Sequence, residues 1–157
     1  MSKGKKNTDM QAAPENDVCA RHLAMGWWGL LFFLVLGVGL ESMHGFKVGL
    51  YLDVSNETRR LMWTLAHAHG ALLALTNIAF GLSTNQMPEW GGAARELASR
   101  GFVAALVLMP LGFFLGGLWV YGGDPSLGIL LVPVGALALF VAVFNTARGA
   151  SASHRRG

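Results

Sequence analysis

Four apolar stretches, each close to the length that crosses a bilayer, constrain this chain more than any other feature. A hydrocarbon core about 30 Å thick takes roughly 20 apolar helical residues. Only 13% of the residues are charged, which is well below the level of about 25% in soluble domains. Because backbone groups in lipid must be paired internally, such stretches cross as helices. We therefore predict an all-α integral membrane bundle of four transmembrane helices, with spans at about 23–44, 61–82, 102–121 and 127–144.

The segments outside these spans are polar and predict two tails. Residues 1–21 combine several charges with Pro14 and lack apolar periodicity, which predicts a flexible cytoplasmic tail. Residues 22–147 form the predicted transmembrane domain, and residues 148–157 form a second cytoplasmic tail. No small-residue cleavage site follows the first apolar run, so we expect a retained anchor and not a signal peptide.

The distribution of lysine and arginine predicts the orientation. One side of the predicted bundle carries Lys3, Lys5, Lys6, Arg21, Arg95, Arg100, Arg148, Arg155 and Arg156, whereas the other carries Lys47, Arg59 and Arg60. The positive-inside rule then places both termini in the cytoplasm. The net charge of +3 comes from tails and loops without a basic-aromatic motif, so no nucleic-acid partner is expected. We expect a multi-pass protein of the bacterial inner membrane.

Small residues predict how the later spans pack. Gly112 and Gly116 lie four apart in the third span, which lets a neighbouring helix approach closely. The sequence Gly122-Gly123-Asp124-Pro125 predicts a tight turn, so spans three and four should form an antiparallel hairpin.

Ionisable side chains interrupt the first two spans. Glu41 and His44 come at the outer end of the first span and, three residues apart, share a helix face. In the second span, His67 and His69 lie about 10 and 13 Å inward of Arg60 at 1.5 Å per residue. All four side chains are therefore predicted in the outer leaflet, on two helices that a short connection makes neighbours. Because ionisable groups at bilayer depth are costly, they usually mark functional sites.

These residue types fit three kinds of site. Glu41, His44, His67 and His69 could form a metal site for copper, zinc or iron. His67 and His69 could bind haem as a cofactor, and a Glu/His chain could also carry protons or hold a quinone head group. His67 and His69 lie about 200° apart around a helix, so one should face the first span and the other the later spans. The structural alternative is that these side chains lie among headgroups or only hydrogen-bond neighbouring helices.

The second span also carries a resemblance to a known family. The sequence His67-Ala68-His69-Gly70, with the residues that follow it to Asn77, resembles histidine-bearing helices of haem–copper-oxidase-like and NnrS-like membrane proteins. Those proteins have many more helices, and most of their histidine ligands have no counterpart here. The arrangement of spans is also similar to that of small bacterial four-span membrane proteins. The resemblance implies that His67 or His69 faces a haem or a metal.

The sequence leads to one main functional hypothesis and two alternatives. The main hypothesis is a membrane protein whose outer-leaflet Glu/His site binds haem or a transition metal, as an accessory to electron transfer. The alternatives are a non-catalytic scaffold or assembly subunit, and a small-solute or proton pathway. No catalytic residue is assigned, and a non-enzymatic role is favoured. The expected partners are the lipid bilayer and either further copies of the chain or a larger membrane complex.

Overall fold

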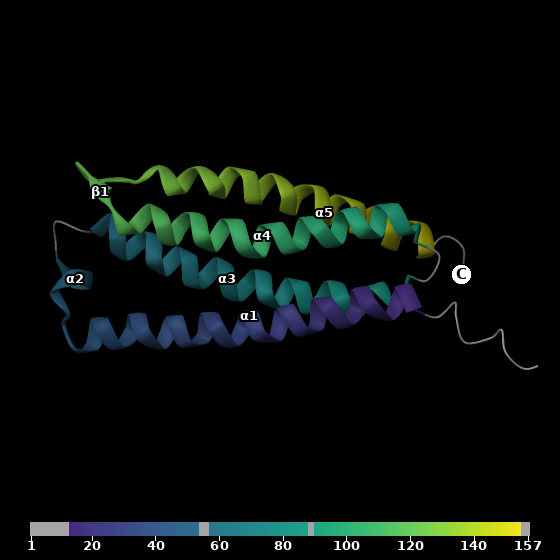
Figure 1. Cartoon of the computed structure of the whole chain (residues 1–157), viewed down its shortest axis with the longest axis horizontal. Coiled ribbons are helices and arrows are strands. Elements are labelled where there is room, and N and C mark those ends of the chain that lie inside the picture. Colours follow the sequence, from purple (N-terminus) through teal and green to yellow (C-terminus); the bar gives the residue numbers. More distant parts are fainter. Residues whose placement is uncertain (1–12, 54–56, 88–89, 155–157) are drawn as a thin grey trace, which may run out of the picture.

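Four long helices make up most of the described part of the chain, as the sequence predicts. The computed structural model describes residues 13–53, 57–87 and 90–154 (Figure 1). The long helices are α1 (Ala13–Gly45), α3 (Glu57–Thr84), α4 (Gly92–Leu118) and α5 (Leu131–His154). Each lies in a segment long and apolar enough to cross a membrane. The short elements are α2 (Gly49–Leu52), β1 (Val120–Tyr121), β2 (Asp124–Pro125) and the 3₁₀ helix η2 (Leu127–Leu130).

The helices follow one another in a row in space. Helix α1 packs on α3, α3 on α4 and α4 on α5, whereas α1 barely touches α4 (Figure 1). The most apolar windows of α3 and α4 are each 44% buried, but those of α1 and α5 are only 17% and 11% buried. The bundle is therefore an open layer whose two edge helices present wide apolar surfaces to the membrane.

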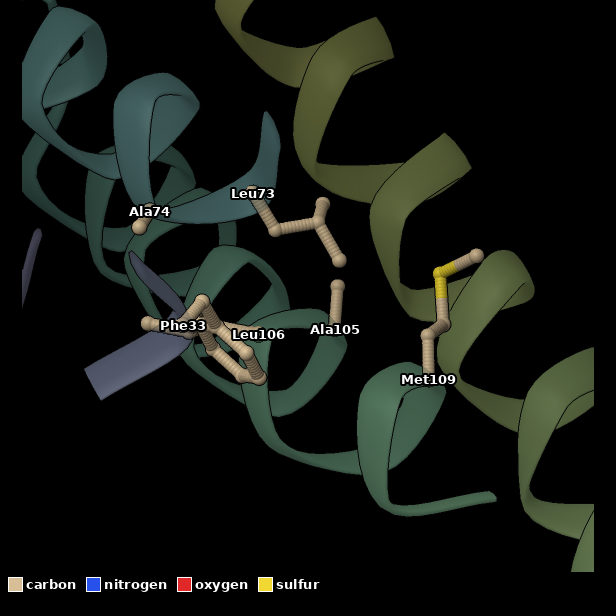
Figure 2. Close-up of a cluster of buried hydrophobic side chains, with 6 residues drawn as sticks. All are labelled: Phe33, Leu73, Ala74, Ala105, Leu106 and Met109. Atoms are coloured by element: carbon tan, nitrogen blue, oxygen red, sulfur yellow. The ribbon is translucent and has the colours of Figure 1, made fainter. Parts of the chain in front are cut away.

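Small clusters of buried side chains hold the row together along its length. The cluster near the middle joins α1, α3 and α4 through Phe33, Leu73, Ala74, Ala105, Leu106 and Met109 (Figure 2). A second cluster lies toward α2 and contains Leu40, Tyr51, Met62, Trp63, Ala66 and Phe113. A third includes Phe80, Trp90, Phe102 and Ala142, and lies at the opposite end.

Glycines set the close approach of the helices. At the α1–α3 interface, His67 lies directly over Gly37, and Phe33 lies directly over Gly70. A Cβ at either glycine would collide with the opposing ring. In the last hairpin, Gly112 lies against Val132 of α5, so the small-residue face predicted in the third span is confirmed.

The turn between the last two spans is also confirmed. Strands β1 and β2 pair antiparallel, with Val120 opposite Pro125. Gly122 and Gly123 connect them with positive φ angles of 60° and 95°. Two consecutive residues with positive φ are typical of a two-residue hairpin turn, which glycine adopts without steric cost.

The boundaries of helices α1, α4 and α5 differ from the prediction. Helix α1 begins at Ala13, within the predicted tail 1–21, because Pro14 is tolerated in a first turn and no breaker follows. Helix α4 begins at Gly92, before the predicted span 102–121, and ends at Leu118, three residues before the end of that span. Helix α5 continues to His154, into the predicted tail 148–157. The parts of the tails at 1–12 and 155–157 lie outside the described residues.

Candidate functional site

Glu41 and His44 lie on the exposed surface near the end of α1. The His44 ring is 6.5 Å from the Tyr51 ring, in an edge-on arrangement. His44 also borders an open surface pocket of about 600 Å³ between α1, α2 and the start of α3. Glu57 and Arg60 line the same pocket, so its surface carries both signs of charge.

His67 connects α3 to α1. Its Nδ1 lies 2.7 Å from the carbonyl oxygen of Phe33, so Nδ1 carries the hydrogen and donates it. The ring fills the space above Gly37. This half-buried side chain therefore forms both a hydrogen bond and a packing contact between the first two spans.

His69 faces the opposite direction. Its Nδ1 donates to the carbonyl of Leu65 on its own helix, at 2.9 Å. Its ring lies 4.8 Å from the ring of Phe113 on α4. The prediction that one histidine faces the first span and the other a later span is thus confirmed.

The four predicted ligands do not form one cluster. In the parts of the chain that the structure describes, no group of three or more His, Cys, Asp or Glu side chains is placed to hold a metal ion. Two of the four, Glu41 and His44, are exposed, and His67 and His69 point to different helices. Haem or metal binding at these residues stays a prediction, which an absorption spectrum and elemental analysis of purified protein would test.

A matched pair of substitutions separates the two histidines. We expect His67→Phe to lower the free energy of unfolding by about 1–2 kcal/mol, because it loses a hydrogen bond between helices. His69→Phe keeps the ring contact with Phe113 and should cost less than about 0.5 kcal/mol. Unfolding by sodium dodecyl sulfate, followed by circular dichroism, measures both. Equal losses would contradict the distinct roles seen here.

The most deeply buried polar side chains lie elsewhere, toward the other end of the layer. His22, Asn77 and Ser99 come from α1, α3 and α4, and none is exposed. The His22 Nδ1 lies 2.7 Å from Asn77 Oδ1, and the His22 Nε2 lies 2.8 Å from Ser99 Oγ. We call these three residues, with Arg21 and Glu96, the His22 cluster.

The hydrogen-bond network fixes the protons of this cluster. The Asn77 Nδ2 donates to the carbonyl of Leu73 at 2.9 Å, so the Asn77 Oδ1 faces His22 and accepts from Nδ1–H. Arg21 donates to Ser99 Oγ at 2.6 Å, and the Ser99 hydroxyl therefore donates to His22 Nε2. A neutral imidazole with its hydrogen on Nδ1 satisfies every partner.

Ion pairs surround the cluster at the surface. Arg21 lies 3.3 Å from Glu96, and Arg100 lies 2.8 Å from the same carboxylate. All three side chains are more than a third exposed, so each pair contributes little by itself. Their effect is to position Arg21 next to Ser99. The buried side chains of His22, Asn77 and Ser99 are all hydrogen-bonded, whereas the Arg21 Nε is buried without a hydrogen-bond partner among the described residues. The cluster joins three helices mainly through these paired groups, which is the arrangement of a structural network.

Sequence reasoning missed this cluster. His22 falls at the boundary between a predicted tail and a predicted span, and Ser99 falls in a predicted loop. The available signal was Asn77, an amide deep in an apolar span, which needs partners from neighbouring helices.

An apolar groove lies between α1 and α4, which make few contacts with each other. It has a volume of about 660 Å³. The residues that line it are Met25, Trp28, Gly29, Phe32, Phe33, Leu36, Ala66, Leu106, Val107, Pro110, Leu111 and Phe114. We call it the α1/α4 groove. Its lining contains no charged side chain, so it can seat only an apolar partner.

Comparison of the chain with family models, with curated proteins and with solved structures gave no match.

Proposed function

We propose that this chain is a non-catalytic, multi-pass subunit of a bacterial inner-membrane complex, and that the α1/α4 groove seats a transmembrane helix of a partner protein. The groove is the observation that carries the proposal. It lies on the membrane-facing surface between two long apolar helices. Lipid tails are as apolar as the side chains of these helices, so the hydrophobic effect does not drive helices together in a membrane. Their association depends on close packing.

The shape of the groove suits a helix. On α1, Trp28, Phe32 and Leu36 recur every four residues and form one wall. From Met25 to Leu36 the wall is about 16 Å long at 1.5 Å per residue. Gly29 and Ala66 are small lining residues, and small residues let a neighbouring backbone approach closely.

The polar side chains inside the layer support a structural role. His22 is hydrogen-bonded on both ring nitrogens, and His67 donates to an α1 carbonyl. These bonds fix the packing of the subunit itself. A chain whose buried polar groups are used in this way fits an assembly role better than a catalytic one.

The proposal includes an orientation. The start of α1 and the end of α5 lie at one end of the layer, opposite α2 and β1 (Figure 1). Since most lysines and arginines belong to the first of these ends, we place both termini in the cytoplasm.

Photo-cross-linking in native membranes tests whether a partner helix binds in the α1/α4 groove. A photoreactive phenylalanine at Val107, inside the groove, should give one discrete adduct with an integral membrane protein. The matched control is the same residue at Val134, which is similarly exposed on α5 but lies outside the groove. Mass spectrometry of the adduct identifies the partner.

A groove-filling variant provides the second arm of this test. Leu111→Trp should abolish the adduct from Val107, because the indole occupies the groove, whereas Leu137→Trp on α5 should leave it unchanged. Adducts with lipid alone at Val107, or equal protein adducts from Val107 and Val134, would contradict the proposal.

A further inference from the structure

A second pocket lies where the start of α4 meets the end of α5. It has a volume of about 310 Å³ and is independent of the α1/α4 groove. The residues that line it are Trp90, Gly91, Ala94, Asn145, Arg148, Gly149, Ala152 and Ser153. We call it the Arg148 pocket. Its α5 residues recur at helical spacing, so one face of the last turns of α5 forms a wall.

Trp90 forms the other wall and is held in place. Its side chain is 8% exposed, and it meets the Phe80 ring edge-on at 6.1 Å. The indole lies so close to Gly149 that a Cβ there would be only 2.8 Å from it. The pocket is therefore bounded by a fixed aromatic side chain and is not a gap between mobile groups.

Arg148 gives the pocket its charge. It is the one charged side chain among the eight lining residues. Its guanidinium lies 5.8 Å from the centre of the Phe144 ring, one turn back toward the membrane. Among the described residues no carboxylate forms an ion pair with it. The guanidinium is thus held over the Phe144 ring, and no described carboxylate competes for its donors.

An apolar surface leads away from this cation along α5. Phe140 and Phe144 are exposed, and their rings stack at 6.3 Å. Arg148 follows Phe144 by four residues, so all three side chains share one helix face. This order, with a cation at the helix end and exposed aromatic rings toward the membrane, matches the order of phosphate and acyl chains in a phospholipid.

We propose that the Arg148 pocket binds the phosphate of an anionic phospholipid, with the acyl chains lying along Phe140 and Phe144. Arg148 donates to the phosphate oxygens. The Asn145 amide also lines the pocket, and its Nδ2 donates one hydrogen to the Val141 carbonyl and retains a second for the phosphate, whereas the Ser153 hydroxyl donates to the Gly149 carbonyl. The pocket lies at the end of the layer that we place in the cytoplasm, where the leaflet carries anionic lipids. The lipid is recognised by charge and by the neighbouring apolar face together.

Native mass spectrometry of the full-length protein in detergent tests this site. The probes are phosphatidylglycerol and phosphatidylcholine with identical acyl chains, and inorganic phosphate. The wild-type protein should retain phosphatidylglycerol about tenfold more tightly than phosphatidylcholine. Arg148→Gln should weaken the phosphatidylglycerol adduct about tenfold, and Arg148→Lys should weaken it less, because the charge remains but the planar donor pair is lost.

Arg100→Gln is the matched control, because Arg100 is an exposed arginine of α4 toward the same end that lies outside the pocket. It should change phosphatidylglycerol retention less than twofold. Three results would overturn the proposal: equal retention of the two lipids, equal losses in Arg148→Gln and Arg100→Gln, or displacement of the lipid by millimolar inorganic phosphate. The last result would make a free anion the ligand. An unchanged melting temperature of Arg148→Gln shows that folding is intact.

Discussion

Replacing His22 by alanine should lower the free energy of unfolding by about 2–4 kcal/mol, through two lost hydrogen bonds and their stranded partners. The substitution removes the acceptor and the donor that Ser99 and Asn77 use. Both partners are fully buried, so water cannot replace the imidazole at no cost. Since the three residues come from α1, α3 and α4, the loss should appear in global unfolding and not in local fraying.

The measurement is unfolding by sodium dodecyl sulfate in mixed micelles, followed by circular dichroism. His44→Ala is the matched control, because His44 is exposed, and it should change the free energy of unfolding by less than about 0.5 kcal/mol. His22→Gln keeps a donor and an acceptor and should recover part of the loss. If His22→Ala and His44→Ala proved equally stable, the His22 cluster would not hold the helices together.

The number and type of the helices could be predicted because they depend on the length and hydropathy of local segments. An apolar run of about 20 residues has few alternatives to a spanning helix. The turn at Gly122 and Gly123 was predictable for a similar reason, since consecutive positive φ angles require such residues. These features are local, because each depends only on the residues of its own segment.

The contacts between helices were harder to predict, because rotation about each helix axis decides them. Each residue turns a helix by 100°. Leu40 is buried at the α1–α3 interface, so its neighbour Glu41 points away and is exposed. Gly37 fixes that rotation by admitting the His67 ring. His67 therefore contacts α1, as expected from its depth in the membrane, but Glu41 lies on a different face of α1.

The His22 cluster could not be predicted from spans that begin and end at polar residues. His22 and Ser99 lie at the polar ends of apolar runs, where composition alone predicts a tail or a loop. In the structure α1 and α4 extend beyond these runs. The extra turn of α1 carries His22, which bonds Asn77, and the extra turn of α4 carries Ser99, which bonds His22. Helices α1 and α4 therefore begin well before the apolar runs from which the spans are predicted.

Introducing a methyl group at Gly26 should have the second large effect. A Cβ at Gly26 would lie 2.9 Å from the Ala74 carbonyl oxygen and 3.0 Å from the Ile78 amide nitrogen. These are backbone atoms, which cannot move aside as a flexible side chain can. Helices α1 and α3 would have to separate, and we expect Gly26→Ala to cost about 2–3 kcal/mol of unfolding free energy.

Gly39→Ala and Gly29→Ala are the controls on the same helix. Nothing lies within 4 Å of a Cβ at Gly39, and a Cβ at Gly29 makes only ordinary contacts, the nearest at 3.5 Å to Ala74 Cβ. Because alanine favours a helix over glycine by about 0.5–1 kcal/mol, both controls should be neutral or slightly stabilising. The same detergent titration measures all three variants. A Gly26→Ala protein as stable as Gly39→Ala would show that the α1–α3 interface is not packed at backbone contact, and the position of His22 against Asn77 would then need another cause.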